Sequence, residues 1–265
     1  SSDLGDERYK IAMDTLRKQM AEQPRTSEGG FWHKLRYPHQ MWLDGIFMAS
    51  PYLVQYGATF NEPALFDEAT KQILLINSKT YDPATGLFYH GWDESREQKW
   101  SNPETGCSPN FWSRSIGWYG AAIVDVLDFL PQETAGRDSI IQILQGLAKA
   151  IVKYQDPSSG TWYQVTDQGA REGNYLESSA TALFIYTLAK AINKGYIGNE
   201  YIEPTQKAFD GMVKTFTRLE EDGSYTITNC CAVAGLGGDS KRYRDGSFEY
   251  YISEPIIEND PKSVG

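Results

Sequence analysis

The stretch MWLDGIFMASPYLVQYG (41–57) begins with a tryptophan and a lone carboxylate and continues as an apolar run of helix length. WSRSIGWYGAAIVDVLDFL (112–130) has the same plan, and NYLESSATALFIYTLAKAI (174–192) is a third stretch of this kind. All three are apolar nearly all round and rich in Gly, Ala and Ser. This composition is typical of helices that are buried on most sides and approach their neighbours closely. We therefore expect three inner helices.

A second class of helix is expected between these stretches. Segments 60–80, 138–155 and 201–219 show apolar residues on one face only, as surface helices do, and 6–20 is expected to be another outer helix. Inner and outer helices alternate along the chain. Alternation of this kind predicts an all-α fold, an (α/α) toroid in which a ring of inner helices is surrounded by outer ones. We expect residues 1–265 to form a single domain.

The connections repeat a further pattern. YDPATGLFYHGWD (81–93), QDPSSGTWYQVTD (155–167) and LEEDGSYTITNC (219–230) each contain an Asp, turn residues, a Gly and an aromatic-rich piece. They recur at a spacing of roughly 70 residues, and each predicts a turn followed by a short strand or extended loop. With about eight helices expected, where a complete toroid needs about twelve, the chain is expected to lack the first few helices.

Composition restricts the class of function. The net charge of −10 and the pI of about 4.9 argue against a nucleic-acid partner, because no basic stripe is present to neutralise phosphates. No apolar run reaches the length of a membrane span. The three cysteines show no zinc spacing and no disulfide framework. Seven Trp and seventeen Tyr favour a carbohydrate or another flat ligand, although most of these rings are expected to fill the core.

The candidate site combines aromatic rings with isolated charges. Asp44 stands between Trp42 and Phe47, and Arg114 stands between Trp112 and Trp118, both at the beginning of an inner helix. Ring faces stack on the CH faces of sugars, while charges bind hydroxyls or carboxylates. The beginnings of the inner helices should meet at one end of the barrel, where their dipoles favour an anionic group.

At these residues the chain resembles a known family. YPHQMWLDGIFMASP (37–51), FYHGW (88–92), NFWSRSIGWY (110–119) and the closing stretch 230–265 are similar to the unsaturated rhamnogalacturonyl hydrolases of glycoside hydrolase family 105, related to the unsaturated glucuronyl hydrolases of family 88. The resemblance implies an (α/α)6 barrel, no cofactor and no metal. It implies that Asp44 is the catalytic acid and base, and that the sugar pocket is lined by His33, Lys34, Trp42, His90, Trp112, Arg114 and Trp118. The family has a further active-site aspartate upstream of WLDG, on a part of the barrel that the sequence given does not contain.

The implied partner is an unsaturated uronyl disaccharide or short oligosaccharide from pectin degradation, and the implied reaction is hydration of its C4=C5 double bond. One carboxyl can protonate C4 and then take a proton from water. Ordinary glycosidases instead need two carboxylates around the anomeric carbon. Because Asp44 is flanked by apolar residues, we expect desolvation to raise its pKa toward the working pH.

Each assignment has a structural alternative. Asp44 could only cap its helix. Arg114 could stack on a tryptophan or pair with a protein carboxylate such as Asp44. Glu177 could complete the ring of polar groups or cap the third inner helix. His90 occupies a place where the other repeats carry Gln164 and Thr226, which favours a functional role.

Two other functions stay open. The same barrel supports hydrolysis of unsaturated glucuronyl oligosaccharides from glycosaminoglycans, and the choice depends on the subsite for the leaving sugar. A non-catalytic carbohydrate-binding toroid is the second alternative. The sequence decides neither the oligomeric state nor the cellular compartment.

Overall fold

The fold is an arc of helix pairs. The computed structural model describes residues 7–169, 171–238 and 242–259. Within them the α-helices are α1 (Glu7–Glu22), α2 (Leu43–Phe60), α3 (Ala64–Thr80), α4 (Ser113–Phe129), α5 (Arg137–Lys153), α6 (Ser178–Asn193), α7 (Ile202–Phe216) and the short α8 (Phe248–Ser253). A 3-10 turn, Asn199–Tyr201, precedes α7. The short strands are β1 (Gln40–Trp42), β2 (Gly91–Asp93), β3 (Thr217–Leu219), β4 (Tyr225–Ile227), β5 (Cys230–Cys231) and β6 (Ile256–Ile257).

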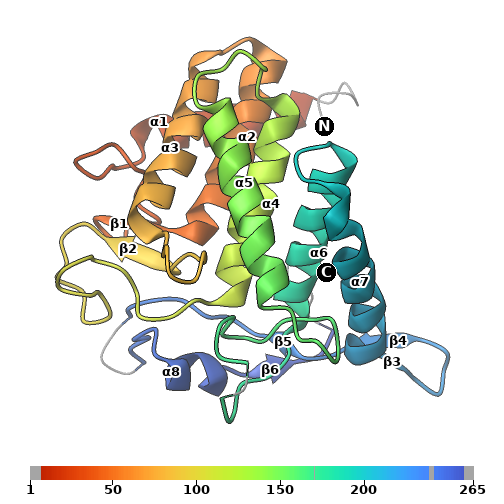
Figure 1. Cartoon of the computed structure of the whole chain (residues 1–265). Helices are drawn as coiled ribbons and strands as arrows, with labels where there is room; N and C mark the ends of the chain where they lie inside the picture. Colours follow the sequence, from red (N-terminus) through yellow and green to blue (C-terminus); the bar gives the residue numbers. More distant parts are fainter. Residues whose placement is uncertain (1–6, 170, 239–241, 260–265) are drawn as a thin grey trace.

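The helices lie in two layers (Figure 1). In the inner layer α4 packs against both α2 and α6. In the outer layer α3 packs against α2, α5 against α3 and α4, and α7 against α6, while α1 contacts the outer side of α2. The prediction of an all-α toroid of alternating inner and outer helices is confirmed. That residues 1–265 form one domain stays a prediction, and residues 1–6, 170, 239–241 and 260–265 lie outside the described part.

Small residues explain how closely α4 approaches α6. A Cβ atom added at Gly117 would lie 2.6 Å from Cβ of Leu183, and one at Gly120 would lie 2.8 Å from Oγ1 of Thr187. Real Cβ atoms do not tolerate such distances, so the two helices could not pack at this separation with alanine at either position. Every residue of α4 from Ser113 to Val124 is buried, as its all-round apolar sequence predicts.

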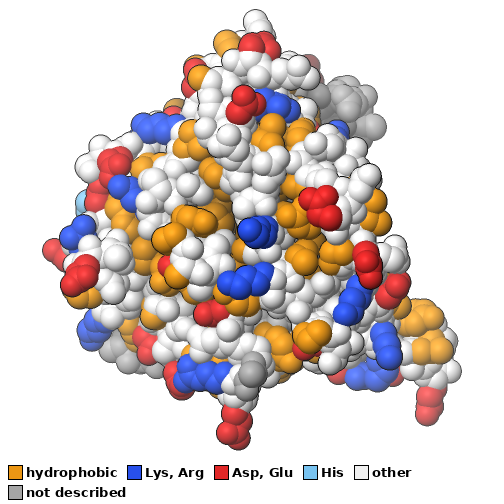
Figure 2. All heavy atoms as spheres, in the orientation of Figure 1, with side chains coloured by type: hydrophobic (Ala, Val, Ile, Leu, Met, Phe, Trp, Pro, Cys, Tyr) orange, Lys and Arg blue, Asp and Glu red, His pale blue; other side chains and the backbone are white. Residues whose placement is uncertain are grey.

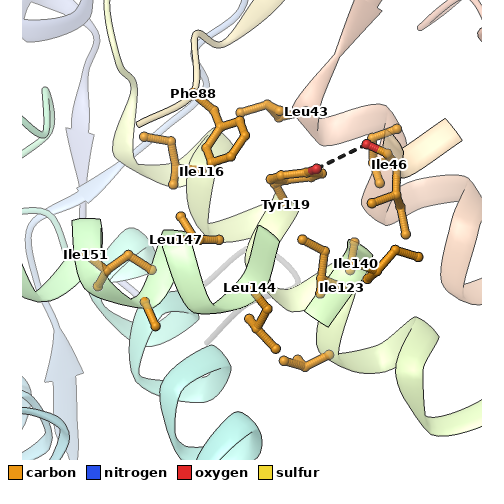
Figure 3. Packing of buried hydrophobic residues seen from close by; sticks show 14 of the residues in the cluster. Leu43, Ile46, Phe88, Ile116, Tyr119, Ile123, Ile140, Leu144, Leu147 and Ile151 are labelled. Carbon is orange, nitrogen blue, oxygen red and sulfur yellow. Dashed lines mark hydrogen bonds between the residues drawn. The ribbon is translucent and has the colours of Figure 1, made fainter. Parts of the chain in front are cut away.

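The main core lies between the two layers. It collects apolar side chains from α2, α3, α4, α5 and α6 together with Trp162 from a connecting loop. Tyr119 of α4 is fully buried in the middle of this cluster, near Phe88 and Leu43 (Figure 3). Its hydroxyl donates a hydrogen bond to the carbonyl of Ile73 at 3.1 Å, so the single polar group of this ring is satisfied.

Three loops hold the beginnings of the inner helices in the same way. The first backbone N–H of α2, from Leu43, donates to the carbonyl of His90 at 3.1 Å. Ser113 of α4 donates to the carbonyl of Gln164 at 3.1 Å, and Ser178 of α6 donates to that of Asn229 at 3.0 Å. The repeats seen in the sequence are therefore structural repeats. The residue equivalent to His90 in the third repeat is Asn229, so the alignment with Thr226 was wrong by three positions.

The loop that carries His90 is also paired to the chain before α2. Strands β1 and β2 run antiparallel, with Met41 opposite Trp92 and Trp42 opposite Gly91. This ladder fixes the chain on both sides of the site end of α2. The other two-stranded ladders, β3–β4 and β5–β6, lie near the C-terminal part of the chain at the same end of the molecule (Figure 1).

The surface mixes charges of both signs with apolar side chains. On the face shown in Figure 2, Lys and Arg lie among Asp and Glu, with hydrophobic groups between them. Among the described residues, no helix has the length and apolar character that crossing a membrane requires.

Candidate active site

Asp44 lies in the first turn of α2, at the end of the molecule where the connecting loops meet. The N-cap of this helix is Trp42, whose extended backbone precedes the first turn. Asp44 is therefore not the capping residue, which removes the simplest structural explanation for it. The residue is buried, with 9% of its surface exposed. A buried carboxylate needs compensating partners.

The partner of Asp44 is His90. Its Nε2 lies 3.1 Å from Oδ2 of Asp44, while its Nδ1 lies 2.8 Å from the hydroxyl of Tyr251. His90 and Tyr251 are both fully buried. Nε2 and Oδ2 are buried and have no well-aligned hydrogen bond to any described residue, so their contact is a close electrostatic one. The three side chains form a continuous row from the core to the site.

The balance of effects on Asp44 corrects one expectation. Burial raises the pKa of its carboxyl, as the sequence predicted. The electrostatic attraction and close contact of His90 and the weaker attraction of His33 more than offset this, so that the pKa of Asp44 is lowered from its ordinary value. The sequence could not show this effect, because His90 lies in another repeat.

Aromatic rings enclose the Asp44–His90 pair. Trp42 stacks on His33 with ring centroids 4.1 Å apart and on Tyr37 at 4.8 Å. His90 packs edge-on against Trp42 at 5.3 Å and lies 4.7 Å from the ring of Trp112. The predicted convergence of the two tryptophan segments is therefore present in the structure.

Both of these tryptophans are largely covered by protein. Trp42 has 4% of its surface exposed and Trp112 has 2%, and Trp112 also stacks on Tyr251 at 6.0 Å. In this structure the two rings form a wall behind the Asp44–His90 pair and expose little ring surface to a sugar. Trp118, one helical turn beyond Arg114, is packed against Phe47 at 4.5 Å, with 8% of its surface exposed.

His33 lies beside this group in a loop before β1. Burial lowers its pKa to about 4, although Asp44 acts in the opposite direction, so its imidazole is neutral near pH 7. Its Nδ1 is buried and has no hydrogen-bond partner in the described residues. Lys34 follows directly but is exposed, and its carbonyl accepts a hydrogen bond from the N–H of Tyr37. Of the predicted residues, Lys34 is the one that the structure leaves at the surface.

Arg114 begins α4 and is held by protein groups. Its Nε donates to Ser179 at 2.6 Å, and its Nη2 contacts Glu177 at 3.1 Å and the carbonyl of Cys231. Burial disfavours its charge, but Glu177 more than compensates, and the pKa of the guanidinium is raised above its ordinary value. Its Nη1 has no hydrogen bond to the described residues.

Glu177 has the capping role that the sequence offered as one alternative, and it pairs with Arg114. As the N-cap of α6 it accepts a hydrogen bond from the N–H of Ala180 at 2.7 Å. The N–H of Cys231 donates to the same carboxylate at 2.9 Å. The anionic partner of Arg114 is thus Glu177 and not Asp44.

Sequence reasoning missed Tyr251 and Gln164. The side-chain oxygen of Gln164 accepts from Nε1 of Trp112 at 3.1 Å, and its nitrogen donates to the carbonyl of Tyr251 at 3.1 Å. No local pattern reveals Tyr251, since 161 positions separate it from His90. Gln164 could have been found, because it occupies the place of His90 in the second repeat.

A pocket of about 290 Å³ adjoins the site between α1 and α2. Its wall includes Leu16, Met20, His33, Trp42, Gly45 and Met48. In the part of the chain that the structure describes, no group of three or more His, Cys, Asp or Glu side chains is arranged to hold a metal ion. The three cysteines are free and buried.

Comparison with known proteins shows the family. The sequence profile of Glycosyl Hydrolase Family 88 matches residues 2–265. A solved structure of a family 105 glycoside hydrolase from C. acetobutylicum superposes with a TM-score of 0.96 at 43% identity, over 99% of this chain and 72% of that one.

Two curated relatives differ in length. Protein Atu3128 of Agrobacterium fabrum is 37% identical over 82% of this chain and 94% of its own length. The unsaturated rhamnogalacturonyl hydrolase YesR of Bacillus subtilis is 26% identical over 83% of this chain, which spans 60% of that protein. The predicted family is confirmed, and the chain belongs to the hydrolases of Glycosyl Hydrolase Family 88 and the related family 105, the unsaturated uronyl hydrolases.

Proposed function

We propose that this chain removes the 4,5-unsaturated uronate from the non-reducing end of rhamnogalacturonan fragments released by a lyase, with Asp44 as general acid and base. The observation that carries the proposal is the environment of Asp44. The ionisable groups that act on this carboxylate are the histidines His90 and His33. Hydration of a double bond needs one carboxyl that gives and then takes a proton, whereas an ordinary glycosidase uses a pair of carboxylates.

The reaction uses the two protonation states of Asp44 in turn. The carboxylic acid protonates C4 of the enol ether, and positive charge develops on C5 and the ring oxygen. The resulting carboxylate then accepts a proton from water as the water oxygen bonds to C5. The product is a hemiketal, which opens and releases the neighbouring sugar. Asp44 is protonated again at the end of the cycle.

The charges around the site suit an anionic sugar. Nη1 of Arg114 is available for the uronate carboxylate, because Glu177 and Ser179 hold the rest of the guanidinium in place. Helices α2, α4 and α6 all begin at this end, and the positive ends of their dipoles favour a negative group. His33, Trp42, His90, Trp112 and Trp118 are proposed to shape the pocket, and Lys34 to contact the substrate from its rim.

The leaving sugar distinguishes this proposal from its nearest alternative. The name of the Bacillus subtilis relative refers to a rhamnogalacturonyl substrate, which supports rhamnose as the neighbouring sugar here. The experiment compares two unsaturated disaccharides, one with rhamnose and one from chondroitin, by the loss of ultraviolet absorbance of the double bond. Faster loss with the rhamnose compound is expected.

The same assay separates the other outcomes. Preference for the chondroitin compound would support the glucuronyl alternative. Binding of either compound without loss of absorbance would support a non-catalytic carbohydrate-binding protein and contradict the proposal. Addition of a chelator should leave the rate unchanged, because the proposed reaction involves no metal.

A further inference from the structure

In the row Tyr251–His90–Asp44, the hydroxyl of Tyr251 contacts His90, and the proposed reaction does not by itself require this contact. The proposed role of Asp44 depends on which ring nitrogen of His90 carries hydrogen. Nε2 lies 3.1 Å from Oδ2 of Asp44. A hydrogen on Nε2 therefore points toward the carboxylate, whereas an unprotonated Nε2 would place a lone pair against it.

Tyr251 limits where that hydrogen can lie. The hydroxyl of Tyr251 is 2.8 Å from Nδ1 of His90 and has no other hydrogen-bond partner among the described residues. Tyr251 is fully buried. When Nδ1 is unprotonated it accepts the hydroxyl hydrogen, and both groups are satisfied.

Protonation of Nδ1 would break this arrangement. The tyrosine oxygen would then have to accept, and its own hydrogen would be left without an acceptor. An orphaned buried donor is costly enough to disfavour that state by about tenfold or more. Burial also keeps the phenol protonated, since it raises the pKa of Tyr251 well above its ordinary value.

We propose that Tyr251 is a positioning residue that fixes the neutral ring of His90 in the tautomer protonated on Nε2, so that Nε2–H points at Asp44. The inference rests on the proposed role of Asp44. It further assigns the two carboxylate oxygens: Oδ2 is buried against Nε2–H, which leaves Oδ1 to exchange the proton with C4.

The other neighbours of His90 lie against its ring faces and edges. The rings of Trp42 and Trp112 flank the imidazole, and His33 is the other histidine that acts on Asp44. Around Tyr251 the ionisable groups are Tyr250, Asp44, Asp245 and Cys231. In the described structure, the Tyr251 hydroxyl is the group that contacts Nδ1 directly.

The test substitutes Tyr251→Phe, which removes the hydroxyl and keeps the ring that stacks on Trp112. The matched control is Tyr250→Phe, since the hydroxyl of Tyr250 accepts from the N–H of Gly235 at 3.0 Å instead of contacting His90. The imidazole nitrogens of protein labelled with ¹⁵N-histidine are followed by NMR from pH 8 to pH 5. The chain has three histidines, so His33→Gln and His39→Gln variants assign the signals.

The unsubstituted protein should show the neutral ring of His90 with Nε2 protonated and Nδ1 unprotonated. In Tyr251→Phe the neutral ring should populate both tautomers. The kcat of this variant on the unsaturated disaccharide should fall about tenfold, with KM within twofold. Tyr250→Phe should retain the tautomer of the unsubstituted protein.

Three results would overturn the inference: Nδ1 protonated in the neutral ring of the unsubstituted protein, an unchanged His90 tautomer in Tyr251→Phe, or a changed tautomer with full kcat. The first of these needs no variant, so poor folding of Tyr251→Phe does not block the test. Failure of the proposed function is seen separately, as full turnover in Asp44→Asn. The His90 tautomer reports on Tyr251 in either case.

Discussion

The beginnings of α2 and α4 carry opposite charges in equivalent places, and the two charges are treated differently. Arg114 has Glu177, Ser179 and the carbonyl of Cys231 around it, so most of its hydrogen-bonding capacity is used by protein. Asp44 has one close contact, to His90, and that contact is not a well-aligned hydrogen bond. The first charge is held by the fold. The second keeps hydrogen-bonding capacity that the proposed reaction would use.

The largest effect is expected from a substitution of Asp44. Asp44→Asn keeps the shape of the side chain but cannot donate and accept the catalytic proton, so kcat should fall by about a thousandfold or more, with KM within tenfold. The absorbance assay measures this. Asp67→Asn is the control, since Asp67 lies in the first turn of the outer helix α3 and is exposed. Near-normal turnover in Asp44→Asn would contradict the assignment.

The next prediction tests the structural role of the Arg114–Glu177 pair by removing the charge of Glu177. Glu177→Gln leaves the guanidinium of Arg114 buried without a counter-charge, and unfolding free energy should fall by about 3 kcal/mol. Denaturant unfolding followed by circular dichroism measures it. Glu62→Gln, which removes the more exposed partner of Arg17, should cost less than about 1 kcal/mol. Equal losses in the two variants would show that the Arg114 pair is no more structural than a surface pair.

A smaller effect is expected when Arg114 keeps its charge and loses its shape. Arg114→Lys can still face Glu177 but lacks the planar fork that bonds Ser179 and leaves Nη1 for a ligand, so KM should rise about tenfold. Steady-state kinetics and the unfolding midpoint should be measured together. An unchanged KM with a lower midpoint would assign Arg114 to the fold alone.

The smallest effect concerns pH and His33. Its pKa is about 4 in the folded protein, below the ordinary value of 6.5, so between these values the unfolded chain binds more protons. Its contribution to stability is therefore complete above pH 6.5 and is lost as the pH falls toward 4. His33→Gln should flatten the decline of the unfolding free energy over this window. An identical slope in His33→Gln and in the unsubstituted protein would refute the prediction.

The helices were predictable because their pattern is local. The all-round apolar character of 112–130 and the one-sided character of 138–155 correctly indicated inner α4 and outer α5. The residues around Asp44 were predictable only in part. Trp42 is two positions away in sequence, but His90 reaches the carboxylate through the packing of a distant loop and lowers the pKa of Asp44. Tyr251 contacts His90 from a still more distant part of the chain. The partner of Arg114 likewise depends on how α6 lies against α4, which the sequence left open.

The three equivalent backbone hydrogen bonds at the beginnings of α2, α4 and α6 separate the task of the main chain from that of the side chain. At His90, Gln164 and Asn229 the carbonyl accepts the same hydrogen bond, while the three side chains differ. Each position can therefore hold its helix and still carry a side chain with its own role. The histidine of the first position contacts Asp44, and the glutamine of the second holds Trp112 behind it.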